Sequence, residues 1–153
     1  MLQRKQTLYL LAAFILSLFM FTGPLSLITI EGDEIILKHS GAVTGSGEQL
    51  EISAWPMTLY FIIVSVLIFF NIFSYKHRIR QMRISVFMMF IAAGMVGIIY
   101  YYIKFIKLNF EGIQNIFQWR IVIPPIILIL LYLAFKGIQR DELMVKAYDR
   151  LRR

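Results

Sequence analysis

Carboxylate side chains gather in two polar stretches of this sequence, and they are the first candidates for chemistry. One group lies between residues 25 and 54 and consists of Glu31, Asp33, Glu34, Glu48 and Glu51. Grouped carboxylates bind Ca²⁺ in the spacing D-x-D-x-D-G, which is absent here. Paired carboxylates can also act as general acid and base, but these show no recognisable pairing. We therefore expect a solvated acidic surface.

Residues that bind transition metals or act as strong nucleophiles are scarce. The chain has no cysteine, which excludes thiolate metal sites and disulfides. Its two histidines, His39 and His77, lie far apart in different segments. We expect no metal, no cofactor, no catalytic residue and no enzymatic activity.

The second polar stretch is the tail, residues 136–153, in which nine of eighteen residues are charged. As a helix, it has Glu142 four residues before Lys146, which is the favourable order for an ion pair. Asp141 projects on the apolar side of this helix, where an unpaired carboxylate is costly. Two arrangements follow. The tail folds under the membrane helices and pairs Asp141 with Arg4, Lys5 or a basic residue of 76–83, or it lies on anionic lipid with Asp141 solvated.

Composition indicates a membrane protein, because 59% of the residues are hydrophobic and 15% are aromatic. A soluble domain has roughly 45–50% apolar residues. Crossing about 30 Å of hydrocarbon takes about 20 mostly apolar residues as a helix. Four stretches qualify or nearly do: 8–24, 55–75, 84–103 and 117–135. No small-residue cleavage site follows the first, so we expect a retained signal-anchor helix.

Lys and Arg are distributed unevenly around these four stretches. Twelve lie in the N-terminus, the 76–83 connection and the tail, whereas four, Lys38, Lys104, Lys107 and Arg120, lie in the other connections. Basic residues accumulate on the cytoplasmic side of membrane proteins. The pattern predicts a multi-pass protein of the bacterial inner membrane with both termini in the cytoplasm. The net charge of +7 then sets orientation rather than binding nucleic acid.

The outer loop, residues 25–54, has the alternation of a small sheet. β-branched residues flank Glu31-Gly32-Asp33, a hairpin pattern, and residues 48–54 alternate as a third strand would. We expect "SGAVTGSG" between them to be a flexible connection. The alternative is a disordered loop with accidental alternation. The start of the fourth apolar stretch is also open because of Pro124-Pro125. A helix that starts at 117 is kinked at these prolines, whereas a helix that starts near Ile123 is not.

The four apolar stretches contain no ionisable residue away from their ends. Asn71 lies near the cytoplasmic end of the second stretch, where its amide can bond to a neighbouring helix. Ala93 and Gly97 form a small-xxx-small pair in the third, which permits close helix approach. We interpret all three as packing residues.

Three polar segments carry a family resemblance. "MLQRKQTLYLLAA", "YKHRIRQMR" and "GIQRDELMVKAYDRLR" resemble an uncharacterised family of four-span inner-membrane proteins of Bacteroidota, known as domain of unknown function 4293. The resemblance runs through the chain and is most specific at both termini. It implies an inner-membrane location and supplies no activity.

These observations predict a single domain over residues 1–153. We expect an all-α membrane protein, a four-transmembrane-helix bundle with a small outer β-hairpin or three-strand sheet and an amphipathic C-terminal helix. We expect it to act as a non-enzymatic accessory or scaffold protein through a cytoplasmic rim. The rim comprises Gln3, Arg4, Gln6, Arg78, Arg80, Arg83, Asp141, Glu142, Asp149 and Arg150.

The alternative is a small oligomeric transporter or lipid-handling protein, with Asn71, Gly94 and Gly97 at a shared interface. In either case we expect contact with anionic lipid at the cytoplasmic face, and either a membrane-protein partner or a homo-oligomer.

Overall fold

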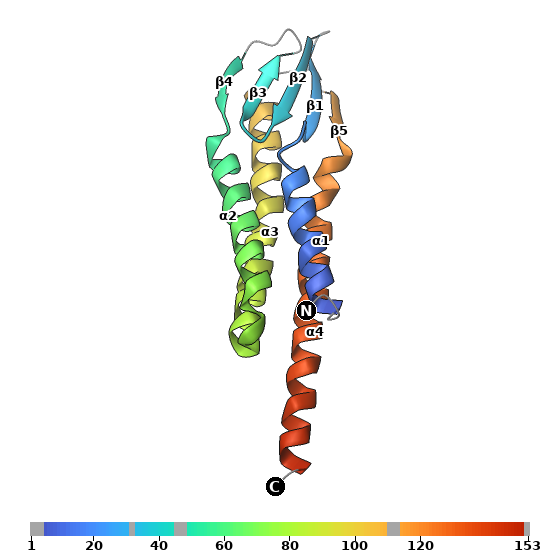
Figure 1. The fold of residues 1–153 in the computed structure, drawn as a ribbon. Coiled ribbons are helices and arrows are strands. Elements are labelled where there is room, and N and C mark those ends of the chain that lie inside the picture. Colours follow the sequence, from blue (N-terminus) through green and yellow to red (C-terminus); the bar gives the residue numbers. More distant parts are fainter. Residues whose placement is uncertain (1–4, 31–32, 45–48, 110–113, 152–153) are drawn as a thin grey trace.

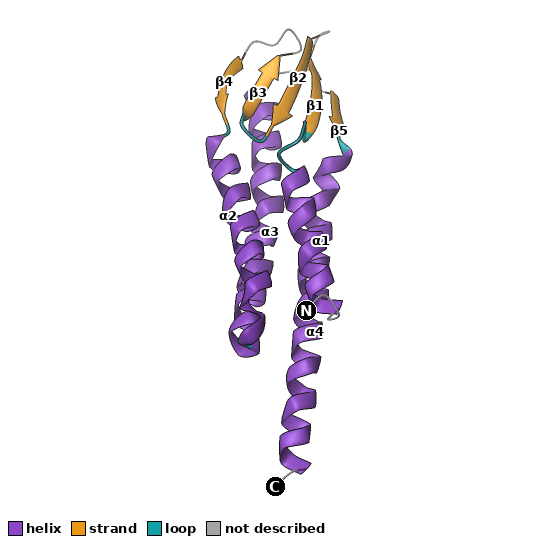
Figure 2. Cartoon of the chain, viewed as in Figure 1, coloured by secondary structure: helices purple, strands orange, loops and turns teal. Residues whose placement is uncertain are grey.

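A computed structural model describes residues 5–30, 33–44, 49–109 and 114–151. Four helices lie side by side, and a β-sheet covers one end of them (Figures 1 and 2). The helices are α1 (Lys5–Phe19), α2 (Trp55–Phe73), α3 (Arg78–Asn109) and α4 (Ile123–Leu151). α1 contacts α2 and α4, and α3 contacts the same two helices. We call the covered end the sheet end and the opposite end the open end.

Three helical segments among the described residues are long and apolar enough to cross a membrane: Trp55–Phe73, Ile79–Leu108 and Trp119–Val145. The protein is therefore a membrane protein, as its composition predicts. α1 is different, because its helix has only 15 residues. At about 1.5 Å per residue it is about 22 Å long, shorter than the roughly 30 Å of hydrocarbon. The predicted stretch 8–24 is helical only to Phe19, and Met20, Phe21 and Thr22 form turns after it.

α4 begins later than the predicted 117. Residues Gln114–Phe117 form a strand, and Trp119–Val122 form a short 3₁₀ helix. Pro124 and Pro125 then occupy the first turn of α4, where the missing N–H groups would have no helical partner in any case. Of the two starts considered, the one near Ile123 is right, and it requires no proline kink.

The sheet is antiparallel and has five strands in the order β4-β3-β2-β1-β5. The strands are β1 (Ser26–Ile30), β2 (Asp33–Lys38), β3 (Gly41–Thr44), β4 (Gln49–Ser53) and β5 (Gln114–Phe117). Alternate residues of the inner strands, including Ile28, Ile35 and Leu37, are fully or almost fully buried. This pattern of one buried face is what an antiparallel sheet resting on helix ends requires.

The predicted antiparallel sheet is confirmed, with two additions. Residues 41–44, expected to be a flexible connection, form β3 between β2 and β4. β5 comes from the connection between α3 and α4 and pairs with β1, placing Ile28 opposite Asn115. The predicted hairpin corresponds to β1 and β2, although Glu31 and Gly32 lie outside the described residues.

The tail neither folds under the helices nor turns aside to lie flat. It continues α4 as one helix to Leu151. Among the described side chains of α4, Ile138 is the last that is fully buried, and the C-terminal part of the helix extends beyond the ends of the other helices (Figure 1). We call residues 139–151 the arm. The arm contains neither Gly nor Pro and is rich in good helix formers, so nothing in its sequence ends the helix.

Candidate functional site

The predicted rim residues that the structure describes lie at the open end. Gln6 is in the first turns of α1, Arg80 and Arg83 are at the start of α3, and Asp141 and Glu142 are on the arm. Gln3 and Arg4 lie outside the described residues. The helices include Arg78, Asp149 and Arg150, but the side chains of these three are outside the described part.

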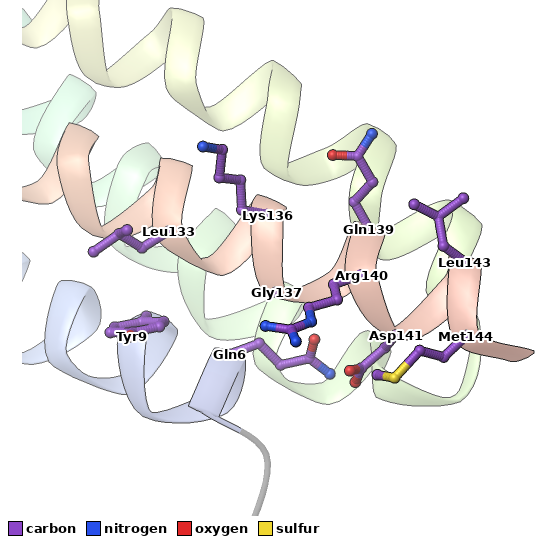
Figure 3. Close-up of a pocket in the computed structure, with 10 residues that line it drawn as sticks. All are labelled: Gln6, Tyr9, Leu133, Lys136, Gly137, Gln139, Arg140, Asp141, Leu143 and Met144. Atoms are coloured by element: carbon purple, nitrogen blue, oxygen red, sulfur yellow. The ribbon is translucent and has the colours of Figure 1, made fainter.

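A groove of about 850 Å³ brings two of these regions together. It lies between the first turns of α1, which supply Gln6 and Tyr9, and the segment of α4 from Leu133 to Met144 (Figure 3). Asp141 lines it, so the structure places Gln6 and Asp141 at one site. Arg80, Arg83 and Glu142 do not line it.

Gln6 forms part of the wall between the two helices. Only 3% of its surface is exposed, and its Oε1 atom is buried without a hydrogen-bond partner among the described residues. It packs on Gly137 of α4, where an added Cβ would lie 3.2 Å from Gln6 Cβ. The glycine therefore allows α1 to approach α4 closely. Figure 3 shows the amide end of Gln6 pointing toward Asp141.

Cationic side chains of α4 lie on both sides of the groove. Figure 3 shows Arg140 reaching back toward α1, where Gln6 and Tyr9 lie. Lys136 points to the other side, and its Nζ atom lies 5.0 Å from the centre of the Tyr132 ring. This distance permits a cation–π interaction. Asp141 is engaged in an interaction of its own.

A second polar cluster joins α2 to α3 at the open end. Asn71 is fully buried and donates from Nδ2 to Ser85 Oγ at 3.0 Å. Gln81 donates from Nε2 to the Asn71 carbonyl at 3.2 Å, and Ser85 donates to the Gln81 carbonyl at 2.9 Å. Asn71 thus bonds to a neighbouring helix. Sequence reasoning did not identify Gln81 and Ser85 as its partners, because no local pattern links them to Asn71.

Near the cluster, Arg80 Nε donates to Ser74 Oγ at 3.1 Å. The Arg80 side chain is otherwise exposed. This bond holds Arg80 against the turn between α2 and α3.

The small residues of α3 play different roles. An added Cβ at Gly94 would collide with the Tyr60 hydroxyl of α2, which donates to the Ile91 carbonyl at 2.8 Å. An added Cβ at Gly97 would have no neighbouring atom within 4 Å, and the Ala93 side chain is exposed. Close packing between α2 and α3 therefore uses Gly94, which lies beside the predicted pair, and within the described chain Ala93 and Gly97 face outward.

At the sheet end, His39 fastens the sheet to α2. Thr58 Oγ1 donates its hydrogen to the His39 carbonyl at 2.7 Å, and His39 Nδ1 lies 3.2 Å from the same Oγ1 atom. Burial lowers the pKa of His39 below its ordinary 6.5; a hydrogen bond to the Phe21 backbone opposes this, and the charge of Lys38 adds to it. His39 is therefore neutral at pH 7. No sequence pattern paired it with Thr58.

A family model described as Domain of unknown function (DUF4293) matches residues 2–151. The chain belongs to this family. The resemblance in its three polar segments is thereby confirmed. No curated protein and no solved structure is similar enough to match this DUF4293 chain.

Among the described residues of this DUF4293 protein, no three His, Cys, Asp or Glu side chains form a group that could hold a metal ion. The open end instead has two surface features, the groove lined by Lys136, Arg140 and the buried amide of Gln6, and the projecting arm.

Proposed function

We propose that this DUF4293 protein is a non-enzymatic accessory or scaffold protein of the bacterial inner membrane that binds a partner protein through its arm. It has four spans, with both termini in the cytoplasm and the sheet outside. Three groups of basic residues support this orientation, since the start of α1, the turn between α2 and α3, and the arm all lie at the open end (Figure 1). The exposed side chains of Trp55 and Trp119 lie at the sheet end, as expected at a membrane interface.

α1 reaches across the membrane with help from non-helical backbone. Met20 and Leu25, which follow α1, are fully buried in the protein. Irregular backbone is tolerated at membrane depth where protein covers it. A short helix followed by a partly buried turn therefore serves as the first span.

The observation that carries the proposal is the continuity of α4. Its 29 residues make a helix about 43 Å long at about 1.5 Å per residue, which exceeds the roughly 30 Å of hydrocarbon. The 3₁₀ helix Trp119–Val122 adds about 8 Å at about 2 Å per residue, so the chain from Trp119 to Lys136 covers about 29 Å, and the arm projects from the open end beyond it. Leu143, Met144 and Val145 on the arm are all exposed. Exposed apolar side chains on a helix outside the membrane fit a partner that surrounds part of the helix with a complementary apolar groove.

Site-specific photo-cross-linking in living cells tests the proposal. A photoreactive amino acid replaces Leu143, whose side chain is 61% exposed, in the protein expressed at its natural level. We expect a discrete protein adduct. The same probe at Phe90, which is 74% exposed midway along α3, is the control and should give lipid adducts only.

Two further variants separate binding from folding. Leu143→Ser with Met144→Ser removes apolar surface from the arm, whereas Ala147→Ser alters another exposed position of the same helix. We expect the double variant to lose the adduct from a probe at Val145, and Ala147→Ser to retain it. A Leu143 probe that yields no protein adduct, or one identical to that of Phe90, contradicts the proposal.

A second candidate, a small oligomeric transporter or lipid-handling protein, is favoured by one observation. Ala93 and Gly97 face outward on α3, so another copy can approach there. Asn71 and Gly94 are engaged within the chain and do not contribute. Gly97→Leu should dissociate such an oligomer in mild detergent and abolish flux or lipid scrambling in vesicles. A wild-type chain that is monomeric and inactive in both assays removes this candidate.

A further inference from the structure

We infer that the groove between α1 and α4 binds the headgroup of an inner-leaflet phospholipid that carries both a phosphate and a hydrogen-bond donor. This inference rests on the proposed crossing of α4 through the membrane, but not on a protein partner.

The groove lies at the depth of a lipid phosphate. Lys136 is the first charged residue of α4 after its start at Ile123, so the helix leaves the hydrocarbon at this point. Tyr9 and Leu133 line the groove on its membrane side, where they can contact the first carbons of an acyl chain. At about 850 Å³, the groove falls within the range of small-molecule sites, about 300–1,000 Å³.

The charge of the lining suits a phosphate. The described lining includes the cations Lys136 and Arg140 and one carboxylate, Asp141, which has an interaction of its own. The Arg140 side chain points to the α1 side of the groove (Figure 3). A guanidinium presents a planar fork of N–H donors that can bind two phosphate oxygens at once. We assign the phosphate to Arg140, with Lys136 adding positive charge from the other side.

Gln6 adds the second requirement. Its Oε1 atom is an acceptor, is buried, lines the groove wall and has no partner among the described residues. Buried acceptors nearly always have a donor. The ammonium of phosphatidylethanolamine or a hydroxyl of phosphatidylglycerol supplies one beside the phosphate, whereas the headgroup of phosphatidylcholine has none. The site therefore distinguishes headgroups by their donors and not by phosphate alone.

Native mass spectrometry of the full chain from mixed nanodiscs tests the inference. The probes are phosphatidylethanolamine, phosphatidylglycerol and phosphatidylcholine with identical acyl chains, and each is scored by its retention on the protein. We expect phosphatidylethanolamine, which is zwitterionic like phosphatidylcholine, to be retained about tenfold more than phosphatidylcholine, since a charged hydrogen bond is worth about one to two powers of ten in affinity. Phosphatidylglycerol should also be retained more than phosphatidylcholine, through its hydroxyl donors and its net negative charge.

Single-residue variants test whether Arg140 binds the phosphate and whether Gln6 binds the donor group of the lipid. Arg140→Gln should reduce retention of all three lipids about tenfold, whereas Arg83→Gln, an exposed cation of the open end outside the groove, should change none. Gln6→Met keeps a side chain of similar length without the acceptor. It should abolish the preference for phosphatidylethanolamine over phosphatidylcholine and leave overall retention intact, a change that a merely structural role would not produce.

Three results would overturn the inference. One is equal retention of all three lipids by the wild type, and another is an equal effect of Arg83→Gln and Arg140→Gln, which indicates general charge attraction. The third is displacement of bound lipid by glycerol phosphate at low concentration, which identifies a site for a soluble phosphate. None of these bears on the Leu143 cross-link, so failure here is distinguishable from failure of the proposed function.

Discussion

The contact between Gly94 and Tyr60 predicts opposite effects for two alanine substitutions one helical turn apart. Replacing Gly by Ala in a helix interior gains about 1 kcal/mol from propensity. At Gly97 nothing lies within 4 Å of the new methyl, so Gly97→Ala should gain up to about 1 kcal/mol. At Gly94 the methyl displaces the Tyr60 hydroxyl from the Ile91 carbonyl. That loses an interhelical hydrogen bond worth about 1 kcal/mol and overpacks the contact by about 1–3 kcal/mol.

The free energies of unfolding of the two variants should therefore differ by about 2–4 kcal/mol, with Gly94→Ala the less stable. Reversible unfolding in mixed micelles, followed by circular dichroism, measures this difference. Tyr60→Phe removes the colliding oxygen, so in that background Gly94→Ala should cost less than half as much. Equal stabilities of Gly94→Ala and Gly97→Ala, or no rescue by Tyr60→Phe, would refute our account of this helix contact.

Three further predictions concern other contacts. The pKa of His39 in the folded protein lies below 6.5, its ordinary value in the unfolded chain. As the pH falls through 6.5, the unfolded chain therefore binds more protons than the folded protein, and the free energy of unfolding decreases until the pH is below the folded pKa. Protection factors for amide exchange in the sheet, which correct for the slower intrinsic exchange at acid pH, should therefore be lower at pH 5 than at pH 7.5, and His39→Gln should flatten the difference. Ser85→Ala leaves the Asn71 amide without its 3.0 Å partner and should cost about 1 kcal/mol in micelle unfolding. Ser65→Ala, whose hydroxyl bonds only within its own helix, is the control and should cost less. Gly137→Leu overfills the contact between α1 and α4 and should destabilise by about 1–3 kcal/mol, with lower cross-linking yield between cysteines introduced on these helices.

Hydrophobic length and the distribution of charge predicted most of the helices. The expected stretch 55–75 corresponds to α2 (Trp55–Phe73). The expected 84–103 became α3 (Arg78–Asn109), which extends at both ends. The reason is physical, since a polar residue marks where a helix leaves hydrocarbon but does not end its hydrogen bonding. Lys104 and Lys107 continue α3 in this way, and the arm continues α4.

Features that depend on distant parts of the chain were beyond sequence reasoning. β5 has only four residues and is a strand because it pairs with β1, which lies far away in the sequence. The groove is equally non-local, because Gln6 and Gly137 have no mutual pattern in the sequence. Gln6 was chosen as an exposed interaction residue, and the structure shows it buried in a wall.

The strand order also has a consequence for how the chain is made. β1 is flanked by β2, which is synthesised directly after it, and by β5, which is synthesised only after α2 and α3. During translation the β5 side of β1 therefore stays open until the segment before α4 has been synthesised. The last strand closes the sheet over the helices, so correct insertion of the final span and completion of the sheet become a single event. A chain that inserts α4 the wrong way round leaves β5 on the wrong side and carries an unpaired strand edge. In the proposed orientation, such an insertion error is therefore marked by an open strand edge.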